Sequence, residues 1–137
     1  MTPSPRCRIL VVDDDADTVE MHARIVKTHA PSYRIVKAHN GREALDILRR
    51  EHVDLVLLDL KMPRLDGFEV LQWIRRNPAT KALPVVVLAG SSFRADIRRA
   101  LELGANSYAA KPGRFEELQV LIDQIADVWL AREGVPG

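Results

Sequence analysis

The chain has 137 residues, 47% of them hydrophobic and 28% charged, a balance that is ordinary for one globular domain and excludes a disordered chain. Its 20 Lys and Arg against 19 Asp and Glu give a net charge of +1, so no overall attraction to nucleic acid or to an anionic membrane is expected. The single cysteine, Cys7, excludes an intrachain disulfide and a cysteine zinc site, and it favours a reducing, cytoplasmic location. No apolar run is long enough for a membrane span, and the N-terminus lacks the apolar stretch of a signal peptide.

Short apolar runs recur along the chain and predict the strands. Strands of a parallel sheet are covered on both faces, so they are continuous apolar runs rather than alternating ones. Three segments have this pattern: Ile9–Val12, Leu55–Leu58 and Val85–Ala89. Tyr33–Ala38 and Ser107–Ala110 are weaker strand predictions, and the more polar Tyr33–Ala38 suits an edge of the sheet. We expect one domain over residues 6–131, with residues 1–5 and 132–137 as flexible termini.

Segments with helical periodicity separate these runs. They are Ala16–His29, Gly41–Arg50, Gly67–Arg76, Phe93–Leu103 and Phe115–Leu130. Asp15 and Asn40 are the expected N-caps of the first two helices, and Gly104 suits the left-handed position after the fourth. A strand–helix unit repeated five times predicts an α/β fold of three layers, in which helices cover both faces of a parallel sheet.

Charged side chains follow three of the predicted strands. Asp13 and Asp14 follow the first strand, Asp59 follows the third, and Lys111 follows the fifth. The carboxyl ends of parallel strands meet at one edge of a sheet, so we expect these side chains to lie together. Oxygen ligands alone suit a hard cation such as Mg²⁺, and an aspartate beside a metal and a lysine can hold an acyl phosphate. The pattern therefore predicts metal-assisted phosphorylation of an aspartate.

Four segments together carry a resemblance to a known family. They are Ile9–Asp15 (ILVVDDD), Leu55–Gly67 (LVLLDLKMPRLDG), Leu83–Gly90 (LPVVVLAG) and Gly104–Pro112 (GANSYAAKP). In this order and spacing they resemble the response-regulator receiver domains of two-component signalling, the CheY-like superfamily, from Arg8 to about Leu130. The C-terminal part also resembles single-domain regulators of the phytochrome-associated kind. The resemblance implies a flavodoxin-like (βα)5 fold with five parallel strands in the order 2-1-3-4-5.

The resemblance also implies roles for individual residues. Asp59 matches the phosphoacceptor, and Lys111 matches the lysine that contacts the phosphoryl group. Asp14 would bind Mg²⁺ directly, Asp13 would act through water, and Lys61 would offer its backbone carbonyl to the metal. The peptide bond between Lys111 and Pro112 is expected to be cis.

One position departs from the family pattern. Ala89 stands at the end of the fourth strand, where the family has Thr or Ser, and it has no hydroxyl to bond a phosphoryl oxygen. Tyr108 matches the aromatic residue whose rotation reports phosphorylation. We expect Ala89 to weaken the coupling to Tyr108 unless Ser91 or Ser92 substitutes, because a hydrogen bond to a charged group is worth roughly 1.5–3 kcal/mol.

The expected function is signalling rather than catalysis. A sensor histidine kinase or a phosphotransfer protein would supply the phosphoryl group to Asp59. The face of the fourth helix, fifth strand and fifth helix would then contact an output partner or, as a homodimer, a second copy of the chain. We expect no direct binding of nucleic acid or membrane, and no enzyme activity beyond self-phosphorylation and autodephosphorylation.

Three alternatives remain open. Ala89 motivates a degenerate receiver that acts as a constitutive protein-binding module. The chain could also be the receiver part of a longer transcriptional regulator. An enzyme on the same fold, such as a phosphatase or a flavin protein, is disfavoured. Lys61 stands where a phosphatase has a second aspartate, and aspartates rather than a glycine-rich loop follow the first strand.

Other polar residues are assigned structural roles. Asp66 is expected to form a turn with Gly67. The four histidines lack metal-ligand spacing and are interpreted as surface or satisfied side chains: His22, His29, His39 and His52. The paired arginines on three predicted helices, including Arg75 and Arg76, are interpreted as solvated faces.

Overall fold

A computed structural model describes residues 7–90 and 93–131. The elements follow in strict alternation: β1 (Arg8–Val12), α1 (Ala16–His29), β2 (Arg34–Ala38), α2 (Gly41–Arg50), β3 (Leu55–Leu58), α3 (Gly67–Arg76), β4 (Val85–Ala89), α4 (Arg94–Glu102), β5 (Ser107–Ala110) and α5 (Phe115–Ala131). The expected flexible ends, residues 1–5 and 132–137, lie outside the described residues, as do Ser91 and Ser92. The single-domain boundary at residues 6–131 stays a prediction.

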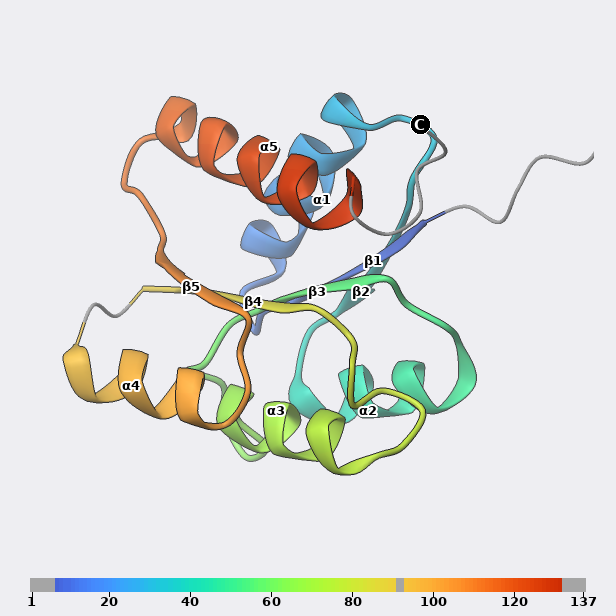
Figure 1. The fold of residues 1–137 in the computed structure, drawn as a ribbon. Coiled ribbons are helices and arrows are strands. Elements are labelled where there is room, and N and C mark those ends of the chain that lie inside the picture. Colours follow the sequence, from blue (N-terminus) through green and yellow to red (C-terminus); the bar gives the residue numbers. More distant parts are fainter. Residues whose placement is uncertain (1–6, 91–92, 132–137) are drawn as a thin grey trace, which may run out of the picture.

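The five strands form one parallel sheet in the order β2-β1-β3-β4-β5, which confirms the predicted fold. Helices α1 and α5 cover one face of the sheet, and α2, α3 and α4 cover the other (Figure 1). The predicted edge position of the second strand is confirmed, because β2 pairs with β1 alone.

Successive side chains along each strand pack alternately into two separate cores, one on each face of the sheet. On β1, Leu10 packs in the core under α2 and α3, whereas Ile9 and Val11 pack in the core under α1 and α5. Both sets are fully buried, since each strand is covered above and below. This two-sided burial is the reason that the central strands are continuous apolar runs in the sequence.

Side chains at the helix N-termini confirm two predicted caps and add a third. The Asp15 carboxylate accepts a hydrogen bond from the Asp17 amide, and the Asn40 side chain accepts one from the Glu43 amide. Asp66 is the N-cap of α3, where it exchanges hydrogen bonds with Glu69 in a complete capping box. The expected simple turn at Asp66 is therefore part of a helix start.

Predicted and observed boundaries differ by one residue at four elements, β1, β2, α4 and α5. Helix α4 begins at Arg94 and ends at Glu102, because Phe93 has extended backbone angles and Leu103 is the C-cap. Strand β2 begins one residue after Tyr33. Gly104 has a φ of 108°, as expected for the left-handed position that ends a helix. In the described part of the chain, none of the helices combines the length and the apolar character that a membrane span requires.

Candidate metal and phosphoryl site

The sheet itself brings the predicted acidic residues together. The Asp13 amide donates to the Ala38 carbonyl (3.2 Å), and the Asp59 amide donates to the Val12 carbonyl (3.0 Å). These bonds extend the β1–β2 and β1–β3 pairing by one residue past the strands. Asp13 and Asp59 are therefore held in strand-like register at the same edge of the sheet, as the sequence predicted.

Three carboxylates converge at this edge. One oxygen each from Asp13, Asp14 and Asp59 lies within 4.8 Å of the other two, a spacing at which they can hold a metal ion. Asp13 and Asp59 are buried, whereas Asp14 is exposed and faces solvent. An all-oxygen set of this kind suits a hard divalent cation that keeps several of its waters.

Lys111 completes the cluster from the end of β5. Its Nζ lies 2.5 Å from Asp13 Oδ2 and 3.5 Å from Asp59 Oδ1. The other oxygen of Asp13 accepts a hydrogen bond from the Asp15 amide (3.0 Å), so both oxygens of the Asp13 carboxylate have partners. Asp13 therefore positions the Lys111 ammonium beside Asp59.

Burial and charge shift the pKa values of the cluster in a consistent way. Burial raises the pKa of Asp59 to about 6, and the neighbouring carboxylates of Asp13 and Asp14 add to this shift while Lys111 opposes it. Burial disfavours the charged form of Lys111, yet its hydrogen bond to Asp13 and the charge of Asp59 raise the pKa of its ammonium overall. The site is therefore a concentration of negative charge that one lysine only partly offsets.

The backbone around Lys111 corrects one prediction. Every peptide bond among the described residues is trans, that between Lys111 and Pro112 included, so the predicted cis bond is wrong. Trans is the lower-energy isomer of a bond before proline by about 0.5–1 kcal/mol. In this geometry the Lys111 amide donates to the Ala89 carbonyl (2.7 Å), and the side chain still reaches Asp13.

Ala89 and Tyr108 lie beside the site on neighbouring strands. Ala89 is the last residue of β4 and is fully buried against the core under α2, α3 and α4. Tyr108 is partly buried, pairs in register with Val87, and packs against the same core. The switch role of Tyr108 stays a prediction, and the expected compensation by Ser91 or Ser92 concerns residues outside the described part of the chain.

The loop after β3 packs tightly behind Asp59. The Gly67 amide, at the start of α3, donates to the Leu60 carbonyl (3.0 Å). A β-carbon at Gly67 would lie 2.2 Å from the Asp59 carbonyl oxygen and 2.7 Å from Leu60 Cα. Only glycine lets the helix approach the backbone of Asp59 and Leu60 this closely.

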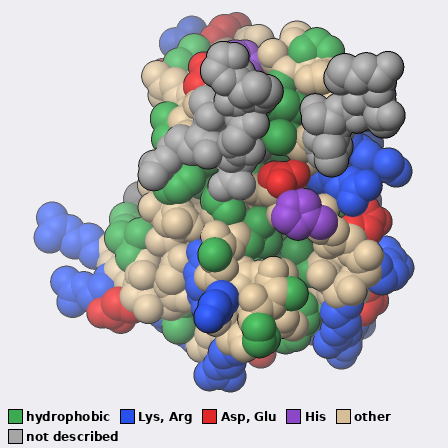
Figure 2. All heavy atoms as spheres, turned by 45° about the vertical axis from the view of Figure 1, so that its right-hand side comes forward, with side chains coloured by type: hydrophobic (Ala, Val, Ile, Leu, Met, Phe, Trp, Pro, Cys, Tyr) green, Lys and Arg blue, Asp and Glu red, His purple; other side chains and the backbone are tan. Residues whose placement is uncertain are grey.

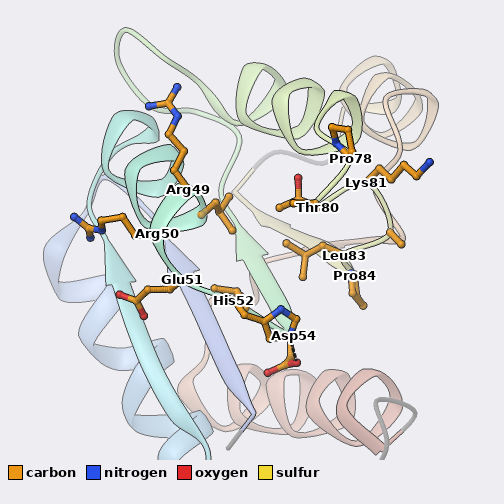
Figure 3. A pocket seen from close by; sticks show the side chains of 14 residues that line it. Arg49, Arg50, Glu51, His52, Asp54, Pro78, Thr80, Lys81, Leu83 and Pro84 are labelled. Carbon is orange, nitrogen blue, oxygen red and sulfur yellow. Dashed lines mark hydrogen bonds and ion pairs between the residues drawn. The ribbon is translucent and has the colours of Figure 1, made fainter. Parts of the chain in front are cut away.

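The carboxylates line an open hollow at the end of the sheet. Its wall is formed by Thr18 on α1 and by residues of the loops after β1, β3, β4 and β5: Asp13, Asp14, Asp15, Asp59, Lys61, Gly90, Phe93 and Lys111. Another hollow lies at the opposite end of the sheet, between the loops that precede β3 and β4 (Figure 3). In Figure 3 the Arg50 and Lys81 side chains point away from each other and out of that hollow. These two cations therefore do not converge on a common point where an anion could bind.

Two polar residues matter more to the structure than the sequence indicated: His22, interpreted as surface or satisfied, and Arg75, interpreted as solvated. His22 is buried on α1, and burial lowers its pKa to about 4. Arg75 is no solvated arginine, because its guanidinium donates to the carbonyls of Lys81, Leu83 and Gly104 and to the Asn106 side chain. The face drawn in Figure 2 has Lys and Arg side chains in several separate groups rather than in one basic patch.

Comparisons with known proteins agree with this site. A profile of the response regulator receiver domain matches residues 9–123. The chain is 38% identical over 135 residues to the probable methanogenesis regulatory protein FilR2 of Methanothrix harundinacea, a match that covers 94% of this chain and 87% of that protein.

Other relatives are longer proteins. A match of 42% identity to the probable cyclic di-GMP phosphodiesterase of Vibrio cholerae covers 78% of this chain but 24% of that protein. A match of 39% identity to the probable transcriptional regulator ycf27 of Porphyridium aerugineum covers 86% of this chain and 47% of that protein. The chain thus spans a quarter to a half of the length of these two relatives.

Solved structures share the whole fold. The phosphorylated cyanobacterial phytochrome response regulator RcpA superposes with a TM-score of 0.88 at 29% identity, covering 97% of this chain and 100% of that one. The Mn²⁺-bound response regulator Rcp1 has a TM-score of 0.84 at 30% identity, with the same coverage. The family profile spans most of the sequence and the acidic cluster lies at the predicted strand ends, so this chain belongs to the response regulator receiver domain family.

Proposed function

We propose that Asp59 accepts a phosphoryl group from the phosphohistidine of a sensor histidine kinase or a phosphotransfer protein. The observation that carries this proposal is the convergence of Asp13, Asp14 and Asp59 with the Lys111 ammonium at one edge of the sheet. Asp59 is buried at the floor of an open hollow, so a donor can reach it from one side only.

Each group in the cluster has a role in the transfer. An oxygen of Asp59 attacks the phosphorus, an O–P bond forms, the N–P bond breaks, and the electron pair returns to the donor imidazole. Lys111 lies 3.5 Å from Asp59 and would contact the transferred phosphoryl oxygens as a point charge. Asp13 holds that ammonium in place and keeps it charged.

A divalent cation fits the cluster, and we assign it to Mg²⁺. Asp14, Asp59 and the backbone carbonyl of Lys61 would bind it directly, and Asp13 would bind it through water. Support comes from the spacing of the three carboxylates and from the Mn²⁺-bound state of the similar regulator Rcp1. When bound, the metal neutralises charge on the phosphoryl group.

The output of the domain is a protein contact. Large apolar side chains are exposed on α4 and α5 and on the loop before α4: Phe93, Leu101, Phe115, Val120 and Val128. They support contact of the α4–β5–α5 face with an output partner or with a second copy of the chain. Tyr108 on β5 would report phosphorylation to this face. A kinase partner and the single cysteine favour a cytoplasmic location.

Intact-mass measurement tests the phosphoacceptor directly. The protein is incubated with Mg²⁺ and acetyl phosphate, with Asp59→Asn as the control. Gain of one phosphoryl group in the wild type alone supports the proposal. If neither protein gains mass, stable binding of beryllofluoride, a phosphoryl mimic, would show a working site with rapid hydrolysis. Absence of both signals would refute the proposal.

Ala89 supports a second candidate, a degenerate receiver that binds its partner constitutively. The residue is fully buried and offers no hydroxyl toward the site. An Ala89→Thr variant separates the two candidates. If partner binding becomes dependent on beryllofluoride only in the variant, the wild-type chain is the constitutive module. If partner binding by the wild type already depends on beryllofluoride, the chain is not a degenerate receiver.

A third candidate is that this chain is the receiver part of a longer protein. The probable transcriptional regulator ycf27 is about twice as long as the region that this chain matches. The chain would then be the receiver part of a longer transcriptional regulator. The length of the mature protein in its own cells, measured by immunoblot and mass spectrometry, tests this directly.

A further inference from the structure

Helix α4 is sparsely packed against the rest of the domain and makes charged contacts with it. Of its nine residues only Ala100 is buried, and its N-cap position makes no side-chain capping bond. The Asp96 carboxylate lies 3.4 Å from the ammonium of Lys61, in the loop after β3. One turn later, the Arg99 guanidinium lies over the Phe68 ring on α3, 4.2 Å from its centre. Little apolar surface therefore opposes a movement of this helix.

Lys61 lies between the phosphoacceptor and this helix. It follows Asp59 by two residues, and its side chain is 63% exposed. It lines the hollow that contains Asp59 and Lys111, and it also lines a second hollow with Asp96 and Arg99. The same ammonium can therefore turn toward the acidic site or toward α4.

We propose that Lys61 changes partners when Asp59 is phosphorylated: its ammonium leaves Asp96 for the phosphoryl oxygens, and α4 is released from the β3–α3 loop. This inference rests on the proposed function, since it requires a phosphoryl group at Asp59. It assigns to the Lys61 side chain a coupling role that is separate from that of its backbone carbonyl at the metal.

The charge and reach of the phosphoryl group favour this exchange. The Asp59 carboxylate is buried, whereas a phosphoryl group on it places its oxygens farther out into the hollow that Lys61 lines. Such a group carries close to two negative charges and three strong acceptors, against one charge on Asp96. The exchange needs no hydroxyl at residue 89, so it couples the site to α4 despite Ala89.

Competition for one ammonium predicts effects of opposite sign at its two partners. Affinity for beryllofluoride is measured by calorimetric titration in excess Mg²⁺ on the full chain. Lys61→Ala removes a cation from the bound state and should weaken binding by about two- to fivefold. Asp96→Asn frees Lys61 from its competing partner and should tighten binding by a similar factor. Lys81→Ala, an exposed lysine at the opposite end of the sheet, should leave the affinity unchanged.

The double variant and α4 itself give independent readouts. The Asp96→Asn change should have a smaller effect in the Lys61→Ala background than in the wild type, because the competition for the Lys61 ammonium is then absent. Hydrogen exchange over Arg94–Glu102 should rise on beryllofluoride binding in the wild type, and should already be raised without it in Asp96→Asn. Circular dichroism of each variant checks that the fold is retained.

The outcomes distinguish the two proposals. If the wild type binds no beryllofluoride and gains no phosphoryl mass, the proposed function fails and the exchange fails with it. If the wild type binds while both single variants match it, or if both weaken binding, the function stands and the exchange at Lys61 is overturned. Unchanged exchange of α4 on binding would overturn it as well.

Discussion

Replacing Gly67 by alanine should damage both the stability of the domain and the acidic site at Asp59. The new β-carbon would lie 2.2 Å from the Asp59 carbonyl oxygen, 1.2 Å short of the 3.4 Å at which ordinary contact begins. Its neighbours are backbone atoms of Asp59 and Leu60, which cannot rotate away as a side chain could. At a helix position with free space around it, replacing glycine by alanine would raise the free energy of unfolding by about 0.5–1 kcal/mol. Here overpacking should dominate and lower the free energy of unfolding by about 1–3 kcal/mol.

Thermal unfolding and beryllofluoride titration together test this reasoning. A loss of about 2 kcal/mol should lower the melting temperature by roughly 4–10 °C in a domain of this size. Beryllofluoride affinity should also fall, because the overlap pushes directly on the Asp59 backbone. Gly113→Ala is the matched control, since a β-carbon there meets nothing within 4 Å. A Gly67→Ala protein as stable as the control, or one that is destabilised but binds with wild-type affinity, would refute the argument.

Three further predictions concern charged groups. Arg75→Lys should lower the free energy of unfolding, measured by urea titration, by about 3 kcal/mol or more, because lysine cannot replace the guanidinium hydrogen bonds to three carbonyls and one side chain. The same change at the exposed neighbour, Arg76→Lys, is the control and should change the free energy of unfolding little. His22 has a pKa of about 4 in the folded state against 6.5 in the unfolded state, so the unfolded state binds the proton more tightly. The free energy of unfolding should therefore fall by at most about 3 kcal/mol as the pH drops from about 6.5 toward 4. His22→Gln should lose this share of the pH dependence, and an unchanged slope of stability against pH would contradict the prediction. Asp14→Asn should weaken Mg²⁺ binding at least about tenfold by calorimetry, whereas the exposed Asp17→Asn should not, and equal affinities would remove Asp14 from the metal site.

Most of the fold could be predicted because its determinants are local or periodic. Strands β1, β3 and β4 are buried on both faces, which makes them apolar throughout and easy to delimit. The site followed from the same logic, since the topology of a parallel sheet brings the ends of β1, β3 and β5 to one edge. Asp13, Asp59 and Lys111 therefore meet as predicted.

Other features depend on contacts that the sequence does not encode locally. The bonds of Arg75 reach a carbonyl 29 residues away, so no pattern within α3 distinguishes it from its solvated neighbour. The burial of His22 could have been predicted, because with Val19, Ala23 and Val26 it lies on the buried stripe of α1. Asp66 and Glu69 also had the spacing of a capping box, which was interpreted as a turn. The trans bond before Pro112 is the default that local energetics favours, and the cis expectation came from the family resemblance rather than from the residues themselves.

The sparse packing of α4 has a consequence for how such a protein can diversify. Six of the nine residues of this helix are exposed, so these positions can be substituted without leaving a cavity in either core. Mutations at these positions can therefore change which partner is bound with little effect on the stability of the fold. The acidic cluster, in contrast, is tied to the central strands, where change is costly. The domain can thus acquire new recognition specificities on one helix while its chemistry is inherited unchanged.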